Sequence, residues 1–164
     1  MTASEAPLLM LNLGCGDDHR SGYLNVDIRA EVRPDRVANV CDLSWLSDAA
    51  AKEIVARDIL EHFSYHATGH VLREWRRVLV LGGTLHLRTP DLHRLMLYWT
   101  SRKETVGATE HYIRLLFGGQ GCPEDTHRTG FTKTSLSTSL KASGFCVAFI
   151  ANVDTNLVCR ATAV

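Results

Sequence analysis

The chain has 164 residues, of which 45% are hydrophobic and 22% charged, so its composition is that of a folded globular protein rather than a disordered one. Its 18 Lys and Arg residues balance its 18 Asp and Glu residues, which gives a formal net charge of zero. This balance argues against a dedicated nucleic-acid binder and against a surface that attaches to acidic membranes. The length predicts a single domain over residues 1–164.

Targeting and metal-binding signals are weak in this sequence. The N-terminal segment MTASEAP lacks a basic stretch followed by an apolar core, and no apolar run reaches the roughly 18 residues that span a bilayer. The five cysteines contain no CxxC pair, which favours free thiols in a reducing compartment, so we expect a cytoplasmic protein. His62, His66 and His70 recur at helical spacing, but a polar helix face explains them better than a metal site does, and no metal is predicted.

Apolar runs alternate with amphipathic stretches along the chain, a pattern typical of an α/β fold. The first apolar run leads directly into the glycine turn Gly14-Cys15-Gly16. Acidic residues stand at or near the ends of the next three predicted strands, at Asp27, Asp42 and Asp58. The predicted strands of this first half cover residues 8–13, 23–26, 37–41, 52–56 and 84–88.

Helical periodicity is strongest where Leu72, Trp75 and Leu79 form one apolar stripe. Further helices are predicted from the N-cap Asp91, across residues 108–117, and from the N-cap Thr132 up to Gly144. The pattern of the C-terminal segment predicts two strands, residues 145–150 and 157–164, joined by a short turn. Because a short turn joins antiparallel strands, the C-terminal pair is predicted to be antiparallel.

The first forty-two residues suit an adenosine-containing ligand. Ligands of open parallel sheets bind beyond the carboxyl ends of the strands, where glycines let the backbone approach closely and Asp27 can accept hydrogen bonds from ribose hydroxyls. Asp42 lies farther along the same predicted edge, where an adenine amino group could reach it. Asp17 and Asp18 would repel a pyrophosphate, and the third glycine of GxGxxG is missing, which disfavours a nicotinamide dinucleotide. An adenosine carrying a positive sulfonium fits better.

Five segments follow one another in the first part of the chain, LNLGCGDD, YLNVDI, CDL, DILEHF and LREWRRVLVLGGTLHLRTPD, and FGGQ, HRTGFT and LKASGF follow later. In combination, these segments resemble the class I S-adenosylmethionine-dependent methyltransferases, and most closely the small bacterial ones. It implies a three-layer, Rossmann-like α/β fold with a mostly parallel sheet and an antiparallel C-terminal strand. Only residues 14–22 connect the first two strands, so we expect the first helix to be reduced or absent.

The resemblance also implies roles for individual residues. At the mouth of the site, the Glu-His pair Glu61-His62 matches the family, and His127 lies in a polar loop that could cover the acceptor; these three are the catalytic candidates. The residues implied to bind S-adenosylmethionine, or its product S-adenosylhomocysteine, are Asn12, Leu13, Gly14, Cys15, Gly16, Asp27, Ile28, Asp42, Leu43, Asp58, Ile59 and Leu60.

The implied activity is methyl transfer from S-adenosylmethionine to a small-molecule or glycan acceptor, with neither nucleic acid nor a membrane as partner. The segment 91–131 is expected to supply the helices and loop on the substrate side. A second subunit could complete the acceptor pocket, which would make the protein a homodimer. The alternative is a non-catalytic, methyltransferase-like binding or regulatory protein, because Asn12 stands where the family usually has an acidic residue.

Overall fold

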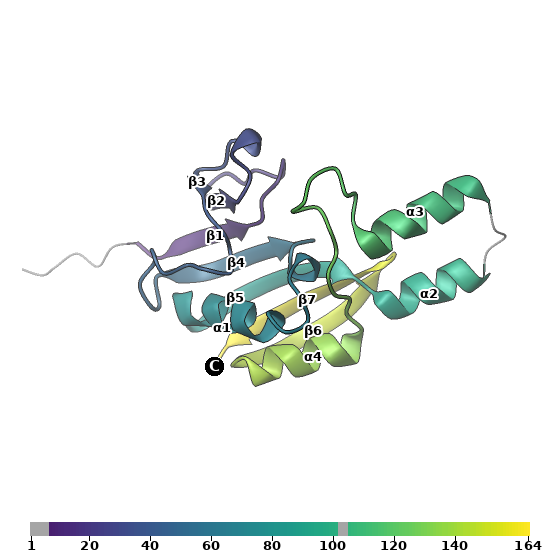
Figure 1. Cartoon of the computed structure of the whole chain (residues 1–164). Helices are drawn as coiled ribbons and strands as arrows, with labels where there is room; N and C mark the ends of the chain where they lie inside the picture. Colours follow the sequence, from purple (N-terminus) through teal and green to yellow (C-terminus); the bar gives the residue numbers. More distant parts are fainter. Residues whose placement is uncertain (1–6, 102–104) are drawn as a thin grey trace, which may run out of the picture.

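The computed structural model describes residues 7–101 and 105–164, shown in Figure 1. Seven strands and four α-helices are found in these residues, together with two 3₁₀ turns, η1 (Ala30–Val32) and η2 (Leu60–His62). The strands are β1 (Leu9–Leu13), β2 (Leu24–Asp27), β3 (Arg36–Val37), β4 (Ala51–Arg57), β5 (Leu79–Pro90), β6 (Phe145–Val153) and β7 (Asn156–Ala163). The helices are α1 (Thr68–Val78), α2 (Leu92–Ser101), α3 (Val106–Phe117) and α4 (Lys133–Ala142).

All seven strands form one sheet in the order β3-β2-β1-β4-β5-β7-β6. The neighbouring pairs from β3 to β5 are parallel, whereas β7 runs antiparallel to both β5 and β6. The predicted α/β class, the Rossmann-like and mostly parallel sheet and the antiparallel C-terminal strand are therefore confirmed. Because β1, β2 and β4 run in the same direction, their carboxyl ends meet at one edge of the sheet, where the site lies.

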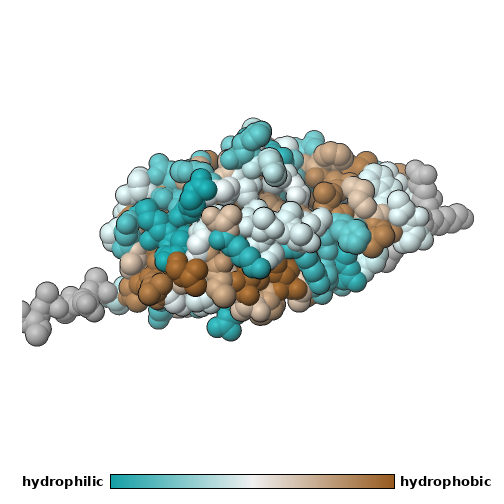
Figure 2. All heavy atoms as spheres, turned by 90° about the horizontal axis from the view of Figure 1, so that it is seen from below, coloured by the Kyte–Doolittle hydropathy of each residue, from teal (hydrophilic) through white to brown (hydrophobic). Residues whose placement is uncertain are grey.

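One face of the sheet carries the hydrophobic core. Strand alternation places Leu11, Ile54 and Leu85 side by side in the register of β1, β4 and β5, and all three are fully buried. Helices α1 and α4 cover this face, and Trp75 of α1 is the largest fully buried side chain of the core. Seen from below, where α4 and the edge strand β6 lie, the surface mixes apolar and polar residues (Figure 2).

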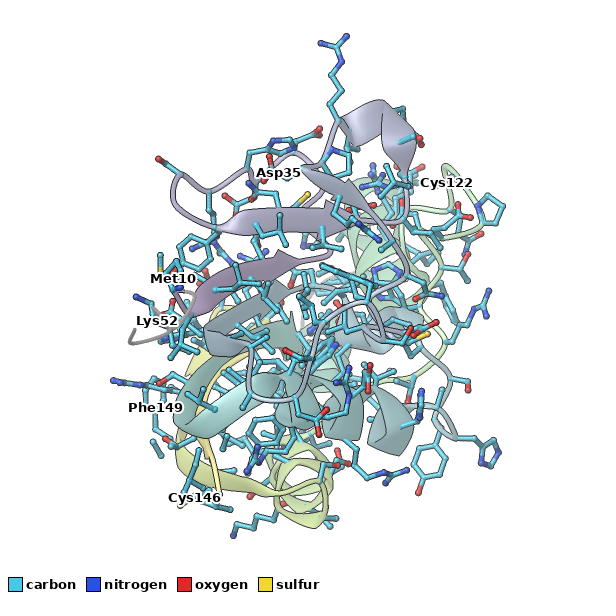
Figure 3. The ribbon with its side chains drawn as sticks, turned by 90° about the vertical axis from the view of Figure 1, so that its left-hand side faces the viewer. Met10, Asp35, Lys52, Cys122, Cys146 and Phe149 are labelled. Carbon is cyan, nitrogen blue, oxygen red and sulfur yellow. The ribbon has the colours of Figure 1, made fainter. Side chains whose placement is uncertain are left out.

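The opposite face has no helix packed along it in the described part of the chain (Figure 1), and Met10 and Phe149 project from this side in Figure 3. The structure therefore differs from the predicted three-layer arrangement in one respect: in the described residues, helices pack along only one face of the sheet. The reason is the shortness of the early connections: no helix lies between β1 and β2, as expected, and only η1 lies between β2 and β3. One row across this open face consists of Asn25, Asn12, Val55, His86, Arg160 and Phe149.

The third strand is shorter than predicted, since β3 covers only Arg36–Val37 and not residues 37–41. The chain turns at Asn39, whose side chain accepts the N–H of Cys41 at 3.1 Å while its carbonyl accepts the N–H of Asp42 at 3.0 Å. This local hydrogen bonding competes with strand pairing, so Asp42 does not end a strand.

Most other predicted elements lie close to their expected positions, but α1 ends at Val78 and β5 already begins at Leu79, which was predicted to belong to the helical stripe. Thr132 caps α4 in a capping box with Ser135, and β6 and β7 form the expected hairpin. In the described residues no helix is long and apolar enough to cross a membrane. All five cysteines are free thiols, and Cys15 and Cys159 are buried.

Candidate active site

The glycine turn after β1 is shaped by two residues that need left-handed backbone. Gly14 has φ +68° and Gly16 has φ +48°, conformations that glycine adopts without steric cost. A Cβ added at Gly14 would lie 2.6 Å from Cγ1 of Ile59, so this position also lacks room for a side chain. The turn therefore packs directly against the segment that follows β4.

Asp27, at the end of β2, fixes the other side of this turn. Its Oδ2 accepts the N–H of Gly16 at 2.8 Å, and its Oδ1 accepts the N–H of Arg29 at 2.9 Å. The residue is only 5% exposed, and the Arg29 guanidinium lies 3.4 Å from the same Oδ1. An ionised carboxylate offers about four acceptor positions, so lone pairs remain on Asp27 for a bound ligand.

The turn, Asp27 and the segment after β4 enclose a cleft of about 420 Å³ at the carboxyl edge of the sheet. Six acidic side chains and three arginines line it, so its charge balance is negative when all are ionised. Such a cleft favours a cationic ligand over a phosphate-bearing one. Its lining consists of Asn12, Gly14, Cys15, Gly16, Asp17, Asp18, Asp27, Ile28, Arg29, Arg57, Asp58, Ile59, His62, Arg88, Glu124 and Asp125.

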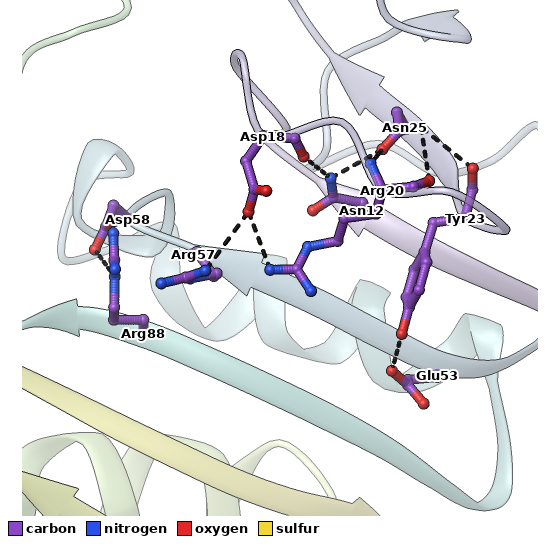
Figure 4. Close-up of polar contacts among 9 residues, drawn as sticks. All are labelled: Asn12, Asp18, Arg20, Tyr23, Asn25, Glu53, Arg57, Asp58 and Arg88. Atoms are coloured by element: carbon purple, nitrogen blue, oxygen red, sulfur yellow. Dashed lines mark hydrogen bonds and ion pairs between the residues drawn. The ribbon is translucent and has the colours of Figure 1, made fainter.

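A polar network holds the floor of the cleft (Figure 4). The Asn12 amide donates to the carbonyl of Asp18 at 2.7 Å and to Oδ1 of Asn25 at 2.9 Å. Asp18 in turn lies 3.6 Å from the Arg57 guanidinium. Asn12 thus ties the glycine turn to the open face of the sheet, a structural task that a carboxylate, which cannot donate, would not perform.

Arg88 and Asp58 form an ion pair across the ends of β5 and β4 (Figure 4). Asp58 has φ +52°, an unusual conformation for a residue other than glycine, and its N–H donates to the carbonyl of Arg88 at 2.8 Å. The backbone and side-chain contacts to Arg88 together hold this strained position, as is common beside ligand sites.

Eight of the twelve residues implied to bind the cofactor line the cleft. Leu13 and Leu60 do not, because both are fully buried in the core on the helix-covered face. Asp42 and Leu43 also lie outside it: Leu43 is fully buried in the core, and the Asp42 carboxylate accepts the N–H of Ser44 in a separate hollow beside α1. The eight are Asn12, Gly14, Cys15, Gly16, Asp27, Ile28, Asp58 and Ile59.

The three predicted catalytic residues come together although they are far apart in the sequence. Glu61 lies in η2 with its side chain 1% exposed, and its Oε1 is 4.0 Å from Nε2 of His127. The rings of His62 and His127 meet edge to face with centroids 4.8 Å apart. The loop that carries His127 is fixed to this turn, because Arg128 and Thr129 both donate their N–H groups to the carbonyl of Glu61.

Burial dominates the electrostatics of this cluster. It raises the pKa of Glu61 to about 7, although the hydroxyl of Thr89 donates to Oε2 at 3.0 Å and opposes the shift. Burial likewise lowers the pKa of His62 and of His127, and for His127 the neighbouring His62 adds to the lowering. The two imidazoles are therefore favoured in their neutral forms.

A second hollow, of about 560 Å³, lies on the far side of this cluster beneath α3. Asp58, Arg88 and Asp125 line both hollows, so the two are neighbours. The residues that only the second one contains come mainly from the segment predicted to face the substrate: Glu61, Pro90, Gly107, Glu110, His111, Arg114, Leu115, Gly118, Gly119, His127 and Asn156.

Seven residues that line the cleft were not among the predicted site residues. The sequence features that could have indicated them differ from one residue to another. Asp17 and Asp18 directly follow the glycines, and Glu124 and Asp125 lie in the polar loop expected to cover the acceptor. Arg57 and Arg88 could have been found from strand alternation, since Leu85 and Leu87 on the buried face put Arg88 on the other one. For Arg29 the sequence offers no comparable signal.

Comparison with known proteins supports the fold rather than a particular activity. No protein-family model matches the chain, and no curated protein matches it. Among solved structures, a SAM-dependent methyltransferase from Methanosarcina mazei is similar with a TM-score of 0.68 and 20% identity, covering 94% of this chain and 92% of the other.

Two further structures point the same way. A SAM-dependent methyltransferase from Archaeoglobus fulgidus has a TM-score of 0.64 at 13% identity, with 94% of this chain and 86% of the other covered. The 1,6-didemethyltoxoflavin-N1-methyltransferase of Burkholderia thailandensis, solved with bound 1,6-didemethyltoxoflavin and S-adenosylhomocysteine, has a TM-score of 0.62 at 16% identity, with 96% of this chain and 71% of the other covered. The chain thus has the fold of the class I S-adenosylmethionine-dependent methyltransferases.

Proposed function

We propose that the protein transfers a methyl group from S-adenosylmethionine to a small-molecule or glycan acceptor. The observation that carries this proposal is the meeting of the Gly14–Gly16 turn with Asp27 in an acidic cleft at the carboxyl ends of β1, β2 and β4. The lone pairs left on Asp27 suit a pair of ribose hydroxyls, and the half-exposed Ile28 offers an apolar surface to an adenine ring. The excess of carboxylates suits a sulfonium.

The chain's own contribution to the reaction is alignment. When bound, the cofactor supplies an electrophilic methyl group on a positively charged sulfur. The cleft residues would hold the adenosine end, and the second hollow, next to Glu61 and His127, would hold the acceptor beside the cofactor. The loop from Gly118 to Gly130 is clamped to Glu61 by two backbone hydrogen bonds, and it would exclude water from the reacting atoms.

Calorimetric titration with S-adenosylhomocysteine tests the binding part of this proposal, and NADH is the matched control ligand. We expect saturable binding of S-adenosylhomocysteine and none of NADH. Binding of NADH in its place would refute the assignment of the cleft. Transfer itself is tested by the appearance of S-adenosylhomocysteine when purified protein, S-adenosylmethionine and a panel of sugars, phenols, amines and acids are combined.

A non-catalytic binding or regulatory role is the second candidate, and Asn12 favours it. Its amide donates to Asp18 and Asn25, so this position puts no negative charge next to the amino group of the methionine moiety. S-adenosylhomocysteine binding without turnover on the whole panel is the result expected of this second candidate, whereas turnover on any acceptor excludes it.

A further inference from the structure

Two ligand-type atoms in the Glu61–His62–His127 cluster are buried without a hydrogen-bond partner. Among the described residues, neither Oε1 of Glu61 nor Nδ1 of His62 has one. An unpartnered buried oxygen or nitrogen costs free energy on the order of 1–3 kcal/mol, so these atoms call for an explanation. The proposed methyl transfer does not explain these two unpartnered atoms, because holding the cofactor and the acceptor in place requires neither atom to lack a hydrogen bond.

The arrangement of His127 shows which of its ring nitrogens is available. Its Nδ1 lies 3.0 Å from the carbonyl oxygen of Leu115, which can only accept, so Nδ1 carries the proton and donates. The other nitrogen, Nε2, is then a lone-pair donor directed toward Glu61. A histidine that donates one N–H to a backbone carbonyl and offers its second nitrogen is the usual outer-shell arrangement around a metal ion.

The three side chains also meet the geometric requirement for a shared ligand. One ligand atom from each of Glu61, His62 and His127 can be chosen so that all three lie within 4.8 Å of one another. Zinc–nitrogen and zinc–oxygen bonds are about 2.0–2.2 Å long, so ligand atoms around one ion lie at most about 4.4 Å apart. A small inward movement of side chains, on the order of 1 Å, is enough to close the set.

We propose that Glu61, His62 and His127 bind one first-row divalent transition-metal ion, at the boundary between the cofactor cleft and the hollow beneath α3. Two imidazoles and one carboxylate favour ions such as Zn²⁺, Co²⁺ or Mn²⁺ over Ca²⁺, which prefers oxygen ligands alone. Three protein ligands leave at least one coordination position open, as in catalytic rather than structural sites. If the proposed methyl transfer is correct, an oxygen or nitrogen of the acceptor would occupy that position; the metal site itself does not depend on it.

No pattern in the sequence indicates this metal site. Glu61 and His62 are adjacent, but the third ligand comes from the loop after α3, and no metal-binding spacing connects them. His66 and His70, which share helical spacing with His62, take no part in the cluster and are exposed. They therefore provide matched controls.

Calorimetric titration of chelator-treated protein with Zn²⁺, in the absence of any cofactor, tests the proposal. We expect one ion per chain, with affinity at least about tenfold lower in Glu61→Gln and in His127→Ala, and unchanged in His66→Ala. Thermal unfolding of each metal-free variant shows whether it is folded; His62→Ala provides a further ligand variant if one of the others is not. Equal Zn²⁺ affinity in the wild type and all folded ligand variants would overturn the proposal.

A Co²⁺ titration followed by visible absorption distinguishes this site from binding to the cysteines. Nitrogen and oxygen ligands give d–d bands alone, which is the expected result, whereas thiolate charge-transfer bands would mean that a cysteine binds the ion. Titration of the same samples with S-adenosylhomocysteine reports on the proposed function separately, so either proposal can fail without the other.

Discussion

The carboxylate of Asp27 accepts the backbone N–H of Gly16 at 2.8 Å and so fixes the geometry of the glycine turn while it lines the cleft. We expect Asp27→Ala to lower the affinity for S-adenosylhomocysteine at least tenfold, because hydrogen bonds to a charged group contribute about 1.5–3 kcal/mol each. Calorimetry of the folded variant measures this, and an unchanged affinity would contradict the proposed role of Asp27.

Asp42→Ala is the matched control for that experiment. The sequence placed this residue at the adenine, but in the structure its carboxylate accepts the N–H of Ser44 in another hollow. We therefore expect Asp42→Ala to leave the affinity for S-adenosylhomocysteine within about twofold of the wild type. A loss comparable to that of Asp27→Ala would mean that the loop after β3 moves into the cleft on binding.

Gly14→Ala tests the backbone of the turn. The new Cβ would lie 2.6 Å from Cγ1 of Ile59, at a residue with φ +68°, so both sterics and backbone conformation oppose it. We expect a loss of about 2 kcal/mol or more in the free energy of unfolding, measured by urea denaturation. Gly107→Ala in α3, where nothing lies within 4 Å, should instead stabilise the protein by up to about 1 kcal/mol. Equal effects at both positions would contradict the argument.

Most of the fold could be predicted because the strong signals are local. The apolar stripe of Leu72 and Trp75, and the acidic ends of β2 and β4, depend on neighbours in the sequence. The short β3 was not predictable in the same way, because the carbonyl of Val40, in the half that is not a strand, accepts the indole N–H of Trp75, a residue of α1 far along the chain.

In the segment that leads into the glycine turn, the alternation of side chains along β1 predicts which residues face the cleft, whereas the family motif alone does not. Asn12 faces the cleft, whereas Leu13 points into the core, because neighbouring strand residues face opposite sides. The contact between Glu61 and His127 could not be foreseen, since it depends on where a long loop comes to rest. The likeness to a family suggested that Glu61 belongs near the site, and the polar loop around His127 suggested the same for that residue.

Cys15 provides a prediction about pH. Burial, and secondly the negative charge of Asp27, raise the pKa of its thiol to about 11. Because the thiolate is the reactive form, the group is almost entirely unreactive thiol at pH 8, and its alkylation should speed up about tenfold per pH unit from 8 to 10. Iodoacetamide labelling followed by peptide mass spectrometry checks this, with the exposed Cys146 as reference. Labelling of Cys15 as fast as Cys146 at pH 8 would show that the turn is open.

Arg77 holds the loop between β3 and β4 against α1, and its replacement tests how that loop is fixed. Its guanidinium donates to the carbonyls of Leu43 and Leu46 and to the carboxylates of Glu74 and Asp48, a fork of contacts that a lysine ammonium cannot reproduce. These contacts raise the pKa of Arg77, with the hydrogen bond to Glu74 as the largest cause.

We therefore expect Arg77→Lys to lower the free energy of unfolding by about 1–2 kcal/mol, because at least two carbonyl hydrogen bonds are lost. Arg73→Lys, on the exposed side of the same helix, is the control and should change stability by less than about 0.5 kcal/mol. Urea denaturation compares the two variants. Since Asp42 and Leu43 lie outside the cleft, Arg77→Lys should leave S-adenosylhomocysteine binding intact, and a loss of binding in the folded variant would mean that this loop supports the cleft after all.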